Sequence, residues 1–221
     1  MGADRPKQYL MVQGKPVIAY CLNIFQRHPQ IDHIVIVAAE EWQPRITEWM
    51  AAEGIIKFFA FAPAGRTRQH SIYNGLKAAR GCTENDGVVI IHDAARPLTS
   101  DQIISDCLQG AHEDGGAMPV ITVKDTTYYS KDGRQIDQLL DRSCLYAGQA
   151  PEAFRFGPYL AIHDAADDAE IAATAGTSQI AYKHGITVRL VKGSERNLKI
   201  TTVEDLNTFE VILAEAKKGE Q

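Results

Sequence analysis

Several features that would place this chain in well-known protein classes are missing from its 221 residues. No apolar run approaches the roughly 18 residues needed to cross a membrane, and no signal-peptide pattern opens the sequence. The net charge of −5 gives no sign of a nucleic-acid-binding face. The four cysteines are scattered, with no CxxC pair and no histidine nearby at metal-ligand spacing. We therefore expect a soluble cytoplasmic protein with reduced thiols.

Other patterns are missing as well. The sequence has no internal repeat, no linker and no low-complexity segment, so we predict a single domain over residues 1–221. It also lacks a GxGxxG motif, which a nicotinamide-dependent dehydrogenase needs after its first strand. What the chain has is a hydrophobic fraction of 45%, which is ordinary for a globular protein and sufficient for one core.

Apolar patterning predicts alternating helices and strands. This alternation is typical of an α/β fold with a Rossmann-like, mostly parallel sheet and helices on both faces. The expected helices cover residues 16–25, 42–52, 68–79, 101–113 and 203–216, and the expected strands cover residues 34–39, 55–61, 88–91, 117–122 and 188–191.

The alternation breaks at about residues 123–143. Two β-rich pieces, 126–129 and 135–139, flank Lys131-Asp132-Gly133, which favours a hairpin turn. A hairpin with exposed tyrosines, inserted into an α/β domain, can be an arm that reaches a partner subunit. It can equally fold back on its own domain, and the pattern alone leaves both interpretations open.

The most informative stretch runs from Val88 to Pro97. Its β-branched residues 88–91 predict a strand buried on both faces, and Pro97 forces a turn. Ligands of open α/β sheets bind beyond the carboxyl ends of the strands. Asp93 can hold a hard cation there, and Arg96 can hold a phosphate.

Polar groups follow other strands in the same way. The loop from Gly65 to Ser71 combines a glycine, a helix start and the donors Arg68 and Ser71, which suits an anion. Lys7 follows a stiff proline, and Lys199 lies in a loop after the last strand. Each of these groups is weak by itself and has an ordinary solvent-exposed alternative. Their recurrence at strand ends indicates a magnesium-dependent enzyme acting on phosphates.

The order of these motifs resembles one family closely. The chain is similar over nearly its whole length to the cytidylyltransferases that act on polyol phosphates, namely 2-C-methyl-D-erythritol 4-phosphate cytidylyltransferase and its relative ribitol-5-phosphate cytidylyltransferase. The motifs are Pro6-Lys7-Gln8-Tyr9-Leu10, Gly65 to Ser71 with Asn74-Gly75-Leu76, His92 to Pro97, Asp125-Thr126, Asp141-Arg142 and Asn197 to Thr201.

The resemblance implies a nucleotidyltransferase with a glycosyltransferase-A-like fold that acts as a homodimer. It implies transfer of CMP from CTP to 2-C-methyl-D-erythritol 4-phosphate, a step of isoprenoid precursor synthesis, with release of pyrophosphate. The implied roles are CTP binding by Gly65, Arg68 and Ser71, phosphate binding in catalysis by Lys7 and Lys199, magnesium binding by Asp93, and binding of the polyol phosphate in the partner's site by Thr126 and Arg142 with Arg96.

The sequence departs from the family pattern at its start. Family members begin with a strand and a glycine-rich loop ending in Arg-Met-Gly, whereas this sequence begins at Met1-Gly2. The strand belongs in the centre of the sheet, so we expect open apolar strand edges. We also expect the 221-residue form to be insoluble or inactive and a version extended upstream to work.

Further departures concern the acceptor. Ala150-Pro151-Glu152 stands where the family usually has Thr-Pro-Gln, and Tyr128 stands where the methylerythritol branch commonly has a lysine. Gly148-Gln149 and the 190–193 stretch resemble the ribitol-phosphate branch. D-ribitol 5-phosphate, giving CDP-ribitol, is therefore the alternative acceptor. A non-catalytic nucleotide-binding relative is a lesser alternative, although retention of Lys7, Asp93 and Lys199 together disfavours it.

Overall fold

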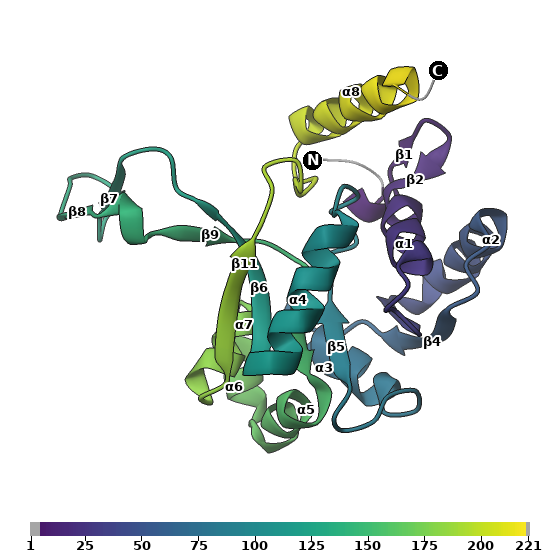
Figure 1. Cartoon of the computed structure of the whole chain (residues 1–221), viewed down its shortest axis with the longest axis horizontal. Helices are drawn as coiled ribbons and strands as arrows, with labels where there is room; N and C mark the ends of the chain where they lie inside the picture. Colours follow the sequence, from purple (N-terminus) through teal and green to yellow (C-terminus); the bar gives the residue numbers. More distant parts are fainter. Residues whose placement is uncertain (1–4, 220–221) are drawn as a thin grey trace.

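The computed structural model describes residues 5–219 as an α/β fold whose sheet is covered by helices on both faces (Figure 1). Strand β3 (Ile34–Ala38) pairs in parallel with β4 (Phe58–Pro63). Strand β11 (Thr187–Lys192) pairs in parallel with β6 (Gly115–Thr122). The predicted fold class is confirmed, and most predicted elements lie within a few residues of their expected positions.

An antiparallel strand that the sequence did not predict lies in the middle of the main sheet. Strand β10 (Glu152–Arg155) pairs on one edge with β5 (Val88–Ile91) and on the other with β6. Strand β9 (Tyr146–Gly148) pairs with the end of β6. The segment of β10 has no β-branched residue, so its strand conformation comes from long-range pairing on both edges rather than from local propensity.

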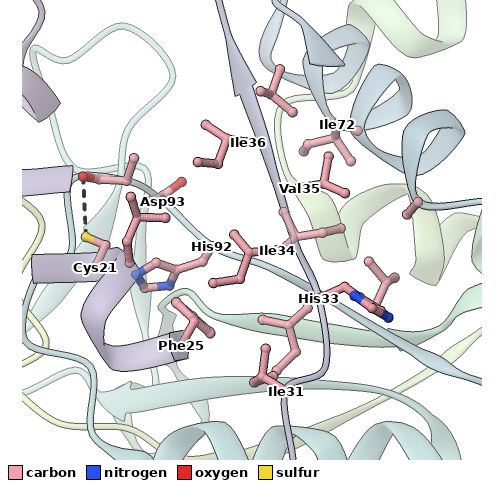
Figure 2. Close-up of a pocket in the computed structure, with 18 of the residues that line it drawn as sticks. Cys21, Phe25, Ile31, His33, Ile34, Val35, Ile36, Ile72, His92 and Asp93 are labelled. Carbon is pink, nitrogen blue, oxygen red and sulfur yellow. Dashed lines mark hydrogen bonds between the residues drawn. The ribbon is translucent and has the colours of Figure 1, made fainter. Parts of the chain in front are cut away.

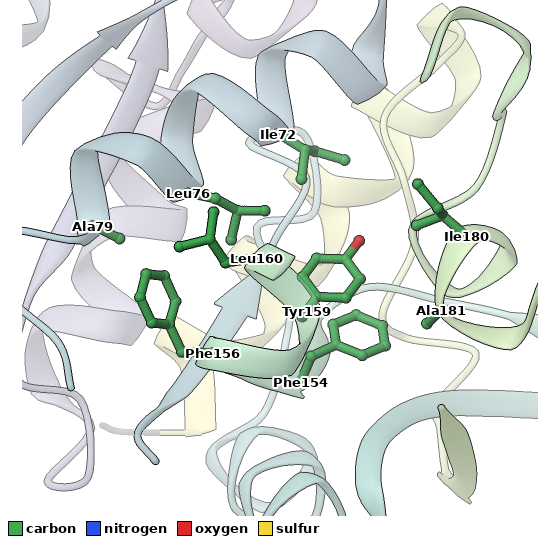
Figure 3. Close-up of a cluster of buried hydrophobic side chains, with 9 residues drawn as sticks. All are labelled: Ile72, Leu76, Ala79, Phe154, Phe156, Tyr159, Leu160, Ile180 and Ala181. Atoms are coloured by element: carbon green, nitrogen blue, oxygen red, sulfur yellow. The ribbon is translucent and has the colours of Figure 1, made fainter. Parts of the chain in front are cut away.

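Side chains alternate between the two faces of this sheet. Val88 and Ile90 pack toward helix α4 (Asp101–Asp114), whereas Val89 and Ile91 pack on the opposite face. That opposite face is covered by α3 (Arg68–Ala79), α5 (Phe156–Ala165) and α7 (Thr177–Lys183). At its centre the rings of Phe154 and Tyr159 stack 4.1 Å apart (Figure 3).

The prediction that residues 88–91 are buried on both faces is only partly correct, because every residue of β5 is half-buried. Among residues 5–219, β5 pairs with β10 alone and β3 pairs with β4 alone. A cavity of about 440 Å³ lies between these two strands. Helix α1 (Val17–Arg27) and α3 also line it, so the edge of β5 away from β10 borders this cavity.

The predicted hairpin is present as strands β7 (Thr127–Tyr129) and β8 (Gln138–Leu140). Together with β9 it projects from the body of the molecule (Figure 1). It does not fold back on its own domain. Tyr128 is 53% exposed and its cross-strand neighbour Leu139 is 63% exposed. Two-stranded hairpins are marginally stable in water by themselves, and exposed apolar side chains on such a hairpin are typical of a surface that binds a partner.

The remaining helices and strands are short or lie outside the main sheet. They are η1 (Lys7–Tyr9), β1 (Met11–Val12), β2 (Lys15–Pro16), η2 (Glu40–Trp42), α2 (Gln43–Glu53), η3 (Arg142–Cys144), α6 (Asp168–Ala173) and α8 (Val203–Gly219). Among residues 5–219 no helix combines the length and apolar character that a membrane span requires.

We expect Phe154→Ala to lower the free energy of unfolding by about 3–5 kcal/mol, because it empties a fully buried site under the stacked Tyr159 ring. Tyr182→Ala serves as the matched control, since that aromatic side chain is 80% exposed, and we expect it to change the stability by less than about 0.5 kcal/mol. Urea unfolding measures both. Equal losses for the two variants would contradict this description of the core.

Candidate functional site

Asp93 stands directly after β5 and lies among three cationic side chains. Its Oδ2 is 2.9 Å from Lys199 Nζ and 3.5 Å from Arg96 Nε, and its Oδ1 accepts a hydrogen bond from Arg68 Nη2 at 3.2 Å. The Asp93 side chain is 15% exposed, whereas those of Lys199 and Arg68 are more than a third exposed. We call Asp93, Arg68, Arg96 and Lys199 the Asp93 cluster.

The charges in the Asp93 cluster shift the pKa values of its members. Burial alone would raise the pKa of Asp93, but Lys199 and Arg68 outweigh it and lower the pKa to about 2. Lys7 lies near the Asp93 cluster. Burial lowers the pKa of Lys7, and the positive charge of the nearby Lys199 lowers it further. One ionised carboxylate thus faces more positive charge than it can neutralise, and the surplus favours a multiply charged anion.

Local structure explains why these lysines are held at the rim. Lys7 begins η1, which is anchored by the buried Tyr9 ring stacked 4.3 Å from Trp42. Lys199 follows the fully buried Asn197, whose side chain donates to the carbonyl of Ala150 at 2.7 Å. The backbone next to each lysine is therefore fixed by buried neighbours, which limits where the two ammonium groups can lie.

Arg96 connects two loops of the rim. Its Nη1 donates to the carbonyl of Asn197 at 2.6 Å, while its Nε, 3.5 Å from Asp93, has no hydrogen bond of good geometry among the described residues. Burial lowers the pKa of Arg96, and the adjacent Asp93 opposes that effect. The Nη1 side of this guanidinium is therefore held by the loop of Asn197, while its Nε faces Asp93.

The loop between β4 and α3 brings three predicted residues to the same edge. The amide N–H of Gly65 donates to the Ser71 hydroxyl oxygen at 2.9 Å, and that hydroxyl donates to the carbonyl of Thr67 at 3.1 Å. A Cβ on Gly65 would lie 2.4 Å from His70 Cβ, so no larger residue fits. Arg68 begins α3 and points to Asp93.

The arm residues lie apart from the Asp93 cluster. Thr126 is exposed directly before β7, and Arg142 Nη1 donates to the carbonyl of Lys124 at 2.6 Å. The hairpin of β7 and β8 next to them projects away from the end of the molecule where β5 lies (Figure 1). A single chain therefore brings Lys7, Arg68, Asp93, Arg96 and Lys199 together but leaves these two arm residues elsewhere.

Asp93 is one of the residues that line the cavity between β3 and β5 (Figure 2). Its walls are mostly apolar, with Ile34 and Val35 from β3 and Ile72 from α3. His92 also lines it, and burial lowers the pKa of this imidazole to about 4, so it is neutral at physiological pH. Its Nε2 lies 3.1 Å from the carbonyl of Arg96, to which it donates. The site therefore has an apolar side and a charged rim.

Two polar residues near the Asp93 cluster were missed by the sequence analysis as site residues. Thr177 is fully buried and its Oγ1 accepts from Arg68 Nη1 at 2.7 Å. The Glu152 side chain is 10% exposed, and its Oε1 lies 4.0 Å from Arg68 Nη2. Only the departure from Thr-Pro-Gln at residues 150–152 marked Glu152 in the sequence. No local pattern marks Thr177, which reaches the rim through the packing of α7.

Across residues 5–219 no three His, Cys, Asp or Glu side chains gather as metal ligands. Mg²⁺ in proteins often takes only one or two carboxylates and completes its shell with water and substrate phosphates. Asp93, ionised and at the rim, fits such a role as one oxygen ligand. It does not form a metal site without a phosphate ligand.

Comparison with known families gives a match over residues 1–215 to the model of 2-C-methyl-D-erythritol 4-phosphate cytidylyltransferase. The enzyme of that name from Geobacillus kaustophilus is 37% identical over 214 residues, which cover 97% of this chain and 91% of the relative. A ribitol-5-phosphate cytidylyltransferase from Streptococcus agalactiae serotype Ia is 32% identical over 217 residues, which cover 98% and 90% of the two chains.

Solved structures agree with these matches. A crystal structure of 4-diphosphocytidyl-2C-methyl-D-erythritol synthase superimposes with a TM-score of 0.80 at 26% identity and covers 94% of this chain and 95% of that one. The 2-C-methyl-D-erythritol 4-phosphate cytidylyltransferase of Thermus thermophilus, at 24% identity and a TM-score of 0.77, covers 96% of each chain and supports the fold alone.

The Asp93 cluster predicts a pH dependence of stability. The pKa of Asp93 is lowered from 3.8 to about 2, so its ionised form stabilises the fold. That contribution is complete above about pH 4 and is lost as the pH falls through the folded-state value near 2. In urea unfolding, we expect Asp93→Asn to flatten the fall in unfolding free energy across this window by up to ~1.4 kcal/mol per pH unit.

Asp86→Asn, at an exposed position in the loop before β5, is the control and should leave the pH dependence unchanged. An Asp93→Asn variant with the same pH dependence as the wild type would contradict the account of the Asp93 cluster.

Proposed function

The chain belongs to the 2-C-methyl-D-erythritol 4-phosphate cytidylyltransferase family, and from this membership we propose that it transfers CMP from CTP to a polyol phosphate. The observation that carries the proposal is the Asp93 cluster, an anion-attracting rim on a chain whose net charge is −5. A nucleoside triphosphate and a phosphate monoester are the anions that such a rim suits. Because both are cytoplasmic metabolites, we place the reaction in the cytoplasm.

The reaction needs positioning and charge more than proton transfer. A phosphate oxygen of the acceptor, already anionic, attacks the α-phosphorus of CTP and forms a new phosphoanhydride bond. The bond between the α- and β-phosphates breaks, and pyrophosphate leaves with its electron pair. No general base is required because the nucleophile carries no proton. The protein must align the two phosphates and stabilise the charge that develops on their oxygens.

Each residue of the rim has a place in this scheme. Lys7 and Lys199 stabilise the phosphate oxygens in the transition state, and Arg68 binds the triphosphate. Gly65 and Ser71 line the nucleotide side, where the lack of a Cβ on Gly65 lets the loop pack closely against His70 in the first turn of α3. Arg96, which is tied to the loop of Asn197, supports the acceptor side.

Asp93 is the residue that would hold a divalent cation such as Mg²⁺. When bound, the cation supplies positive charge to the triphosphate oxygens. Asp93 is suited to this task because its pKa of about 2 keeps it ionised across the physiological range. Its present partners Lys199 and Arg68 are partly exposed and can turn toward phosphate oxygens instead.

The acceptor that we favour is 2-C-methyl-D-erythritol 4-phosphate, which would make the product an isoprenoid precursor. The family model and the 37% identical Geobacillus relative support this choice. D-Ribitol 5-phosphate is the second candidate, supported by the 32% identical streptococcal relative and by Tyr128 in place of a lysine. A pocket shaped for a branch methyl group discriminates against a linear polyol by about tenfold or more.

The arm supports a homodimer in which each chain completes the site of the other. Thr126 and Arg142 lie away from the Asp93 cluster of their own chain, and the arm exposes Tyr128, Tyr129 and Leu139. A two-fold partner can cover these apolar side chains and receive the two polar ones at its acceptor site.

The direct test of the activity is pyrophosphate release from CTP with each acceptor in parallel. We expect release that requires both CTP and the acceptor, with kcat/KM about tenfold higher for 2-C-methyl-D-erythritol 4-phosphate than for D-ribitol 5-phosphate. The reverse order would assign the ribitol branch. Binding of CTP without release from either acceptor would favour the non-catalytic alternative and overturn the proposal.

Mixing two inactive variants tests the lysine and the shared site together. We expect Lys199→Met and Arg142→Met each to lower the rate by about 10²-fold, because each loses a charge that faces transition-state phosphate. If the arm serves the partner's site, refolding an equal mixture restores about a quarter of the wild-type activity, since half of the dimers regain one intact site.

Lys183→Met on the exposed face of α7 is the control and should retain full activity. Activity of the mixture no higher than that of either variant alone would show that each arm serves its own chain.

A further inference from the structure

Glu152 is a buried acid that the proposed chemistry does not use. It is the first residue of β10 and pairs with Ile91, two positions before Asp93. Glutamate is rarely buried without a partner, because removing its charge from water is costly. The contacts of its two carboxylate oxygens therefore show what it does in the fold.

The two oxygens of Glu152 face different partners. Oε2 accepts the backbone N–H of Ser178 at 2.8 Å and also accepts the Ser178 hydroxyl. These bonds fix the carboxylate to the first turn of α7. Oε1 is left facing Arg68 Nη2 at 4.0 Å, within ion-pair range but beyond hydrogen-bond distance.

Arg68 consequently lies between two carboxylates. Its Nη2 donates to Asp93 at 3.2 Å and also faces Glu152, while its Nη1 donates to the buried Thr177 at 2.7 Å. Both Thr177 and Glu152 are held by the start of α7, the first by its place in the helix and the second through Ser178. One side of the guanidinium is thus tied to α7 and the other to the rim.

We propose that Glu152 is a positioning residue that keeps the Arg68 guanidinium at the nucleotide site when Asp93 turns to a new partner. Arg68 would exchange its Asp93 contact for a phosphate oxygen of the nucleotide while Glu152 and Thr177 hold its other side. Without Glu152, Asp93 is the one carboxylate among the described residues within 4.0 Å of the Arg68 guanidinium, and Arg68 must break that ion pair to meet phosphate. The inference rests on the proposed function, since it assigns the binding of the triphosphate to Arg68.

Glu152→Gln is the informative variant, because it introduces the residue that the family usually carries there, and its amide oxygen can still accept from Ser178 while the charge specific to this chain is lost. We expect KM for CTP to rise about tenfold, with kcat changed less than about threefold, because the change acts on Arg68 before chemistry begins. Thr177→Val removes the other anchor of Arg68 and should raise KM in the same direction. A purely structural role of Glu152 would lower the melting temperature without this selective change in KM.

The same substitution in an Arg68→Met background shows whether Glu152 acts through Arg68. We expect Glu152→Gln to have no further effect on KM there. An equal rise in KM in both backgrounds would overturn the proposal. A fall in KM in the wild-type background would also overturn it, since Glu152 would then only repel the phosphates of CTP.

Nitrogen-15 NMR of the Arg68 guanidinium tests the contact without any nucleotide. We expect hindered rotation about its Cζ–Nε bond in the wild type and faster rotation in Glu152→Gln. Unchanged rotation would contradict the positioning role. If the wild type neither binds nor turns over CTP while the rotation changes as expected, the proposed function fails and the Glu152–Arg68 contact stands.

Discussion

The ion pairs of Asp93 are the constraint on which the rest of the site depends. A carboxylate that is only 15% exposed stays ionised because Lys199 and Arg68 face it. Arg96 lies beside it in the same loop after β5, whereas Arg68 begins α3 and Lys199 follows β11, so a single acid connects three segments at one rim. Removing the charge would leave the cations to repel one another, and binding phosphates there uses that same surplus of positive charge.

Neutral contacts reinforce this rim. Asn197 is fully buried, and its side-chain amide donates a hydrogen bond to the carbonyl of Ala150 and accepts one from the Thr99 hydroxyl, on two separate segments. Gln149 donates to the carbonyl of Ser194 at 2.8 Å in the same region. Because buried amides without partners are costly, these bonds define the path of the loop that carries Lys199. The lysine is thus placed before any substrate arrives, which is what charge stabilisation of a transition state requires.

The sequence predicted that several of these polar residues lie at strand ends because the signals for that position are local. A buried strand followed by an acid, or a glycine followed by a helix start, places Asp93 and Arg68 without knowledge of the partners. Strand β10 and Glu152 could not be predicted in this way, since an antiparallel strand between β5 and β6 is produced by pairing far apart in sequence.

The half-burial of β5 has the same kind of origin. Its β-branched run is typical of a strand with neighbours on both edges, yet its outer edge borders the apolar cavity beside β3. The apolar residues of a strand predict that its faces are covered, and helices do pack against both faces of β5. The same residues do not predict whether each edge of the strand is paired with another strand.

Carbon-13 titration of the Asp93 carboxyl group, with and without CTP and a divalent cation, measures the ionisation on which the rim depends. We predict a pKa of about 2 in the free protein and a displaced Asp93 resonance once both ligands are added. A pKa near the ordinary value of 3.8, or a resonance unmoved by saturating ligands, would contradict it.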